Sequence, residues 1–113
     1  MQEREIVEYE NCPVKSQLER HVYMSIDRYK ENFVECFKHA LSGFEREDRY
    51  DICHILKIDP QGKVIDVKLT DLDAKVPEEV HWCLTQESYQ MNFSHIMVEP
   101  YTQKVYIPIS YKI

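Results

Sequence analysis

The sequence predicts an α+β domain in which a three-stranded antiparallel sheet carries two helices packed on one face, in the order helix, strand, strand, helix, strand. Three observations support this class. An apolar stripe at helical spacing occupies the first half of the chain, a turn signature joins two β-rich runs in the middle, and an alternating apolar run ends the chain. The 113 residues, 43% of them hydrophobic, are enough for one core but not for two. We therefore expect residues 16–113 to form the domain and residues 1–15 to be an N-terminal tail or linker.

A long helix is predicted for residues 16–43. Ser16 marks its start, because a serine followed three positions later by Glu19 forms a capping box. Gly43 marks its end, since glycine readily takes the left-handed conformation of a C-terminal cap. The opposite face carries charges of both signs, which is typical of a solvated surface. The apolar stripe consists of Leu18, Val22, Ile26, Tyr29, Phe33, Cys36 or Phe37, Ala40 and Phe44.

A hairpin is predicted for residues 50–70. In its turn, Asp59 can bond its own backbone, Pro60 pre-sets φ, and Gly62 supplies a positive φ without steric cost. A two-stranded hairpin alone is marginally stable, so the helices must cover its apolar face. The alternation assigns Ile52, Leu56 and Ile58 to one face of the first strand, and Ile65, Val67 and Leu69 to one face of the second.

The second helix and the last strand follow. Pro77 and the two acids after it open a short helix that should end near Glu87 or Ser88. Its expected inner face is Val80, Cys83 and Leu84, with Trp82 beside them. The last strand places Val105, Ile107, Ile109 and Tyr111 on one face. Pro108 cannot donate to a ladder, so this strand should lie at an edge of the sheet, or Pro108 should point its missing donor outward.

Charge and hydropathy restrict the partners. The net charge is −6 and no basic stripe is present, so we expect no nucleic-acid binding. No apolar run approaches the roughly 20 residues that cross a bilayer, so this segment should not insert directly into a membrane.

The side chains that usually carry chemistry form no catalytic or metal-binding pattern. Cys53 and His54 are neighbours in a strand and point to opposite faces, and His81 and Cys83 diverge on a helix. The two glycines are needed for a cap and a turn, which leaves none for a phosphate loop. We therefore predict a protein that is not an enzyme and has no metal and no cofactor, with the histidines scattered. They are His21, His39, His54, His81 and His95.

The cysteines leave the cellular compartment open. Cys12, Cys36, Cys53 and Cys83 allow three complete pairings and include no C-x-x-C pair. On the residues alone, small buried thiols in a reducing compartment are the favoured interpretation.

Several motifs together resemble the C-terminal domain of TonB-type energy transducers. They are the strand-turn-strand Leu56-x-Ile58-Asp59-x-x-Gly62-x-Val64-x-x-Val67, the helical Val80-x-x-Cys83-Leu84, the aromatic Phe93 and the closing Val105-x-Ile107-Pro108-Ile109-x-Tyr111. With a cysteine in each helix, the chain is similar to the AgmX/PglI-like branch of that family. The resemblance covers roughly residues 30–113. Cys12 and Cys53 are additional to the family pattern, and their pairing stays open.

The resemblance implies a non-enzymatic protein-interaction module on the periplasmic side of a bacterial envelope, as the soluble part of an inner-membrane-anchored protein. Its partner would be an outer-membrane or periplasmic protein, bound as an added strand at the sheet edge. It also implies a disulfide between Cys36 and Cys83. The edge strand predicted to bind the partner is Lys104, Val105, Tyr106, Ile107, Pro108, Ile109, Ser110 and Tyr111.

A different class of function remains as the alternative. With reduced thiols, the chain would be a cytoplasmic adaptor that forms homodimers or larger homo-oligomers through the same edge. For Tyr101 and Tyr106, core packing and partner binding are equally weighted.

Overall fold

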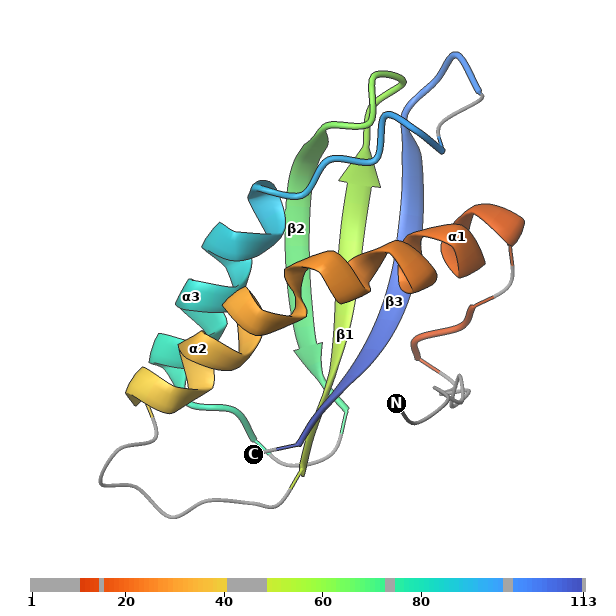
Figure 1. The fold of residues 1–113 in the computed structure, drawn as a ribbon. Coiled ribbons are helices and arrows are strands. Elements are labelled where there is room, and N and C mark those ends of the chain that lie inside the picture. The colour runs from red at the N-terminus through yellow and green to blue at the C-terminus, as the bar shows by residue number, and fades with distance from the viewer. Residues whose placement is uncertain (1–10, 15, 41–48, 73–74, 97–98, 113) are drawn as a thin grey trace.

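The computed structural model describes residues 11–14, 16–40, 49–72, 75–96 and 99–112. Its three strands are antiparallel, in the order β2-β1-β3: β1 is Arg49–Ile58, β2 is Val64–Asp71 and β3 is Gln103–Lys112. The helices are α1 (Gln17–Ser25), α2 (Lys30–Ala40) and α3 (Glu78–Tyr89), and they lie over one face of the sheet (Figure 1). The predicted α+β class, with a three-stranded antiparallel sheet and helices on one face, is confirmed.

The long first helix begins as predicted but is interrupted. The Ser16 hydroxyl accepts from the Glu19 N–H at 3.0 Å, and the Glu19 carboxylate accepts from the Ser16 N–H at 3.1 Å. The prediction of one unbroken helix is wrong, because a 3₁₀ turn, η1 (Ile26–Tyr29), separates α1 from α2. The Ser25 hydroxyl donates to the carbonyl of His21 at 2.9 Å, a back-bond that commonly bends helices. The predicted end at Gly43 lies outside the described residues.

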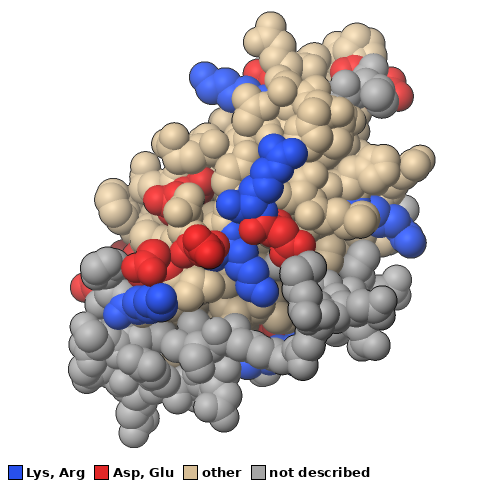
Figure 2. Space-filling view, in the orientation of Figure 1, with Lys and Arg blue, Asp and Glu red and all other residues tan. Residues whose placement is uncertain are grey.

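The core lies between the helices and the inner face of the sheet. Phe33 and Phe37 of α2 are fully buried and pack on alternate residues of β1. The Phe33 ring lies 5.4 Å from the His54 ring, and the Phe37 ring lies 4.8 Å from the Tyr111 ring of β3. The predicted stripe is therefore the face that packs on the sheet. Figure 2 shows acidic and basic side chains intermingled on the outer, helical side.

One face assignment in β2 is wrong. The register between β1 and β2 shifts between Lys57 and Ile58, so that Ile58 pairs with Val64 and Lys57 with Asp66. Ile65 is the extra residue of this bulge and is 47% exposed, while Val64 takes the buried position. A bulge breaks the strict alternation on which the prediction relied. Val67 and Leu69 do pack against the core, partly buried.

The turn between β1 and β2 forms as predicted. The Asp59 carboxylate accepts from the N–H groups of Gln61 and Lys63, each at 2.9 Å. Gly62 has a φ of +85°. Its carbonyl also accepts from the Phe93 N–H at 2.8 Å, which brings the segment after α3 against the turn.

The segment around α3 differs from the prediction in exposure. Val80, Leu84 and Ser88 face the sheet and are fully buried. Trp82, which we expected beside this inner face, is 68% exposed, because it lies on the opposite side of the helix. The weak alternation after Tyr89 yields one isolated bridge between Lys63 and Asn92.

Part of the predicted tail belongs to the folded unit. Cys12 and Val14 are buried. Cys12 is bonded to Cys53 of the central strand, on the face of the sheet opposite to the helices. Residues 1–10 lie outside the described part of the chain.

Gly62 provides the first prediction. A Cβ at this position would lie 2.0 Å from the backbone nitrogen of Ser94, in addition to the strain of a positive φ. We expect Gly62→Ala to lower the free energy of unfolding by more than about 2 kcal/mol, measured by denaturant titration. The neighbouring Gln61→Ala, at an exposed position, serves as the control and should change it by less than about 0.5 kcal/mol. Equal losses in the two variants would contradict the turn geometry.

Candidate functional site

The predicted binding strand, β3, is an edge strand whose outer side is partly closed. The Tyr106 N–H donates to the Glu19 carboxylate of α1 at 2.6 Å, so it points away from β1. Backbone groups alternate in direction along a strand, so position 108 also points outward. Pro108 has no N–H there, as predicted. Two successive outward positions of β3 therefore offer no donor to an added strand.

Glu19 has two roles at this edge. One carboxylate oxygen completes the capping box with Ser16, and the other accepts from Tyr106. The side chain is only 5% exposed, and α1 packs against β3. The helix start and the closure of the β3 edge therefore depend on the same carboxylate.

The other edge strand, β2, is open. The Leu72 N–H donates to the Asp51 carbonyl at 2.9 Å, which fixes the direction of the backbone groups along the strand. By alternation, Thr70 and Lys68 face β1, whereas Val67 and Leu69 point their N–H and C=O groups outward. Within the described residues, these outward groups have no hydrogen-bond partner. They offer an added strand two consecutive outward-facing positions.

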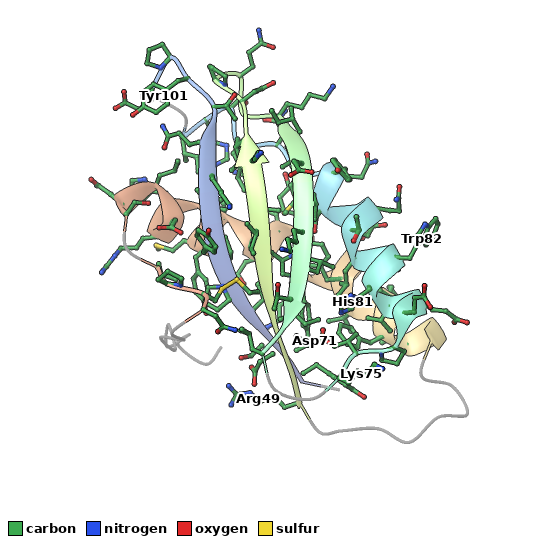
Figure 3. All side chains as sticks on the ribbon, turned by 180° about the vertical axis from the view of Figure 1, so that it is seen from behind. Arg49, Asp71, Lys75, His81, Trp82 and Tyr101 are labelled. Carbon is green, nitrogen blue, oxygen red and sulfur yellow. A yellow bond between two sulfur atoms is a disulfide. The ribbon has the colours of Figure 1, made fainter. Side chains whose placement is uncertain are left out.

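One flank of α3 adjoins this open edge. His81 reaches from α3 to β2, where its Nε2 lies 2.5 Å from the Asp71 carboxylate. Figure 3 shows His81 between the helix and the strand, while Trp82 points away from the sheet. Thr85 and Tyr89 follow His81 at steps of four and share its flank. A strand added to β2 would therefore be hydrogen-bonded to the sheet along one edge, and this flank of α3 would cover one of its faces.

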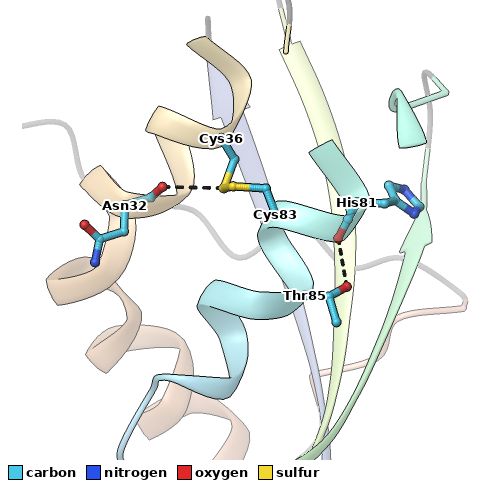
Figure 4. The surroundings of a disulfide bond; sticks show 5 residues. All are labelled: Asn32, Cys36, His81, Cys83 and Thr85. Carbon is cyan, nitrogen blue, oxygen red and sulfur yellow. Dashed lines mark hydrogen bonds between the residues drawn. A yellow bond between two sulfur atoms is a disulfide. The ribbon is translucent and has the colours of Figure 1, made fainter. Parts of the chain in front are cut away.

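Two disulfides close the fold. Cys36 of α2 is bonded to Cys83 of α3, as the resemblance implied, and Figure 4 shows the bond joining the two helices. The Cys36 sulfur lies 3.6 Å from the Asn32 carbonyl oxygen, a contact without a hydrogen bond because a disulfide sulfur carries no proton. The second bond, between Cys12 and Cys53, settles the pairing that the sequence left open. The described part of the chain contains no free cysteine.

The disulfides bear on location. Such bonds persist in oxidising compartments, so they favour an extracellular or periplasmic location over the alternative with reduced thiols. Among the described helices, none is both long and apolar enough to cross a bilayer.

His54 forms a buried polar chain that the sequence analysis missed. Its Nδ1 lies 3.2 Å from the Ser88 hydroxyl, and its Nε2 lies 2.8 Å from the Tyr111 hydroxyl. His54, Ser88 and Tyr111 are all completely buried. A substrate therefore cannot reach this serine-histidine pair, and its role is structural. The sequence did contain a signal for a buried His54, because residue 54 lies between the inward-facing Ile52 and Leu56 in the alternation of β1.

A cleft is the remaining candidate for a binding site in the described part of the chain. A cleft of about 570 Å³ between α1 and the segment before β3 is lined in part by Leu18, Ile96 and Tyr101, with His21 and His95 at its wall. No three His, Cys, Asp or Glu side chains come together as metal ligands in the described ranges. For Tyr101 and Tyr106 the sequence analysis left core packing and partner binding as alternatives. In the structure, Tyr101 is 58% exposed and Tyr106 is half-buried.

No family model, curated protein or solved structure matches the chain. The resemblance to TonB C-terminal domains therefore stays a prediction.

The pH dependence of stability tests the His54 chain. Burial, and to a smaller extent the charge of His81, lowers the pKa of His54 to about 3 from 6.5. Because the folded-state pKa is below the unfolded value, the stabilisation is fully present above pH 6.5. It is lost as the pH falls toward 3, at up to about 1.4 kcal/mol per pH unit.

Between pH 7 and pH 4.5, we therefore expect the wild type to lose about 2 kcal/mol more unfolding free energy than His54→Gln, which keeps hydrogen-bonding groups but does not titrate. His21→Gln, at an exposed position, should follow the wild type. Parallel profiles for wild type and His54→Gln, from urea titrations of the oxidised protein, would contradict a neutral buried His54.

Proposed function

We propose that this chain is a non-enzymatic protein-binding module of an oxidising compartment, and that it binds an extended segment of its partner as an additional strand along β2. The observation that carries the proposal is the pair of outward N–H and C=O groups at Val67 and Leu69. Main-chain hydrogen bonds to such an edge give affinity, and alternate side chains give selectivity.

This proposal changes the strand but keeps the mechanism predicted from the sequence. At the β3 edge, the donor of Tyr106 is used by Glu19, and Pro108 has none. At the β2 edge, both donors are available, and the flank of α3 with Thr85 and Tyr89 borders the position of the added strand. We therefore prefer β2 over the predicted strand at Lys104–Tyr111.

The proposed compartment and the proposed partner have different supports. The two disulfides support an oxidising location. The family resemblance gives the finer proposal: the periplasmic part of an inner-membrane-anchored protein, whose partner is an outer-membrane or periplasmic protein. This finer proposal depends on the resemblance alone.

Proline substitution at each edge tests the proposal. Peptides selected from a random display library on the oxidised protein would be synthesised and titrated against two variants. Val67→Pro removes an outward donor of β2, and Lys104→Pro removes the corresponding outward donor of β3. Neither removes a hydrogen bond to β1, and edge strands tolerate proline. We expect Val67→Pro to weaken binding at least tenfold and Lys104→Pro to leave it within twofold.

The opposite pattern, with binding lost in Lys104→Pro and kept in Val67→Pro, would return the site to β3 and refute the β2 proposal. Thermal unfolding of both variants provides the control for folding. Failure to select any peptide that binds either edge would argue against strand addition altogether.

A further inference from the structure

Two unpaired charges lie on the outer face of β2 beside its open edge. Asp66 and Lys68 are two residues apart, so both project on the face opposite to the helices, and both are exposed. Lys68 stands opposite Ile55 of β1, which carries no charge. Neither Asp66 nor Lys68 forms an ion pair in the part of the chain that the structure describes. Lys57 of β1 stands opposite Asp66 but forms no ion pair with it in the described part of the chain, and β1 supplies no charge opposite Lys68.

A strand added antiparallel to β2 would place its own side chains directly beside these charges. Directly opposed residues in such a pair have Cβ atoms about 4.5 to 5.5 Å apart, and opposite charges there are favourable whereas like charges are unfavourable. The residue facing Lys68 should therefore be acidic and the residue facing Asp66 basic. Because the added strand runs in the opposite direction, its acidic residue comes first and its basic residue follows two positions later.

In the added strand, the residue before the acidic position and the residue between the acidic and basic positions project to the other face of the sheet. There they would lie beside Val67 and Leu69, which are half-buried, and under the flank of α3 that carries Thr85 and Tyr89. Tyr89 is 38% exposed. Apolar side chains suit this position, because they would bury apolar surface on both elements.

We propose that the partner segment carries the pattern apolar, acidic, apolar, basic in its N-to-C direction, with the acidic residue on Lys68 and the basic residue on Asp66; this deepens, and rests on, the strand addition proposed above. The charges also protect the edge from indiscriminate pairing, because a strand with the reverse order places like charges together. The pattern therefore selects both the partner's sequence and its direction.

A second copy of this chain is the competing occupant. Its own Ile65-Asp66-Val67-Lys68 has the same order of residue types. However, α3 packs along β2, so a two-fold pairing would bring two α3 helices together over the joined strands. A separate extended segment meets only one helix. We therefore assign the edge to another protein.

The test uses two synthetic eight-residue peptides that differ only in the order of one glutamate and one lysine. Each is titrated into the ¹⁵N-labelled, oxidised protein, and the amide shifts of β2 report binding. We expect the wild type to bind the acid-first peptide about three- to tenfold more tightly. The double variant Asp66→Lys with Lys68→Asp should prefer the base-first peptide by a similar factor. Raising the salt concentration should shrink both preferences.

A matched control exchanges charges elsewhere. Glu35 and Lys38 form an exposed pair on α2, and Glu35→Lys with Lys38→Glu keeps the composition without touching β2. This variant should retain the wild-type preference. Equal binding of both peptides at β2 would overturn the charge pattern and leave strand addition standing, whereas shifts confined to other parts of the protein would overturn both. A concentration-dependent dimer whose interface maps to β2, seen by sedimentation, would overturn the assignment to another protein.

Discussion

The hydrogen bond from the Tyr106 N–H to Glu19 decides which edge of the sheet is open. It holds α1 against β3 and occupies an outward donor of that strand. Pro108 removes the next outward donor, so the middle of β3 is closed to a further strand. β1 is paired on both sides, so β2 is the edge strand that keeps two consecutive outward donors free in the described part of the sheet. The proposed binding edge, its flank on α3 and its charge pattern all depend on this asymmetry.

The central strand is held from both faces. On the helical face, the rings of Phe33 and Tyr111 and the hydroxyl of Ser88 surround His54. On the other face, Cys53 is bonded to Cys12, across a sequence separation of 41 residues. Together with the bond between α2 and α3, this makes a fold whose stability depends on oxidation. For loops of this size, chain entropy assigns each bond roughly 4 kcal/mol. Such dependence agrees with the oxidising location that the two disulfides favour.

Local signals made much of this fold predictable from the sequence. The capping box at Ser16, the turn built by Asp59 and Gly62, and the edge position of Pro108 each follow from residues close together in the chain. The bond between Cys36 and Cys83 came from family resemblance, because no local rule connects two helices 47 residues apart.

What was missed depends on contacts distant in sequence or on irregular backbone. The capping role of Glu19 could be predicted, because Ser16 lies three residues away. Its contact with Tyr106 could not be predicted, because 87 residues separate the two in the sequence. The bulge at Ile65 and the 3₁₀ turn before Lys30 break the periods on which face assignments depend. As a result, the sequence analysis assigned the proposed strand addition to β3, whereas the backbone geometry of the structure favours β2.

Amide hydrogen exchange of the free, oxidised protein, measured residue by residue with NMR, tests the open edge most directly. Exchange reports whether each N–H is hydrogen-bonded in the folded state. We expect slow exchange at Lys68 and Thr70, whose N–H groups face β1, and at Tyr106, whose N–H is bonded to Glu19. We expect fast exchange at Val67 and Leu69. Protection of Val67 and Leu69 equal to that of Lys68 and Thr70, or fast exchange at Tyr106, would contradict an open β2 edge.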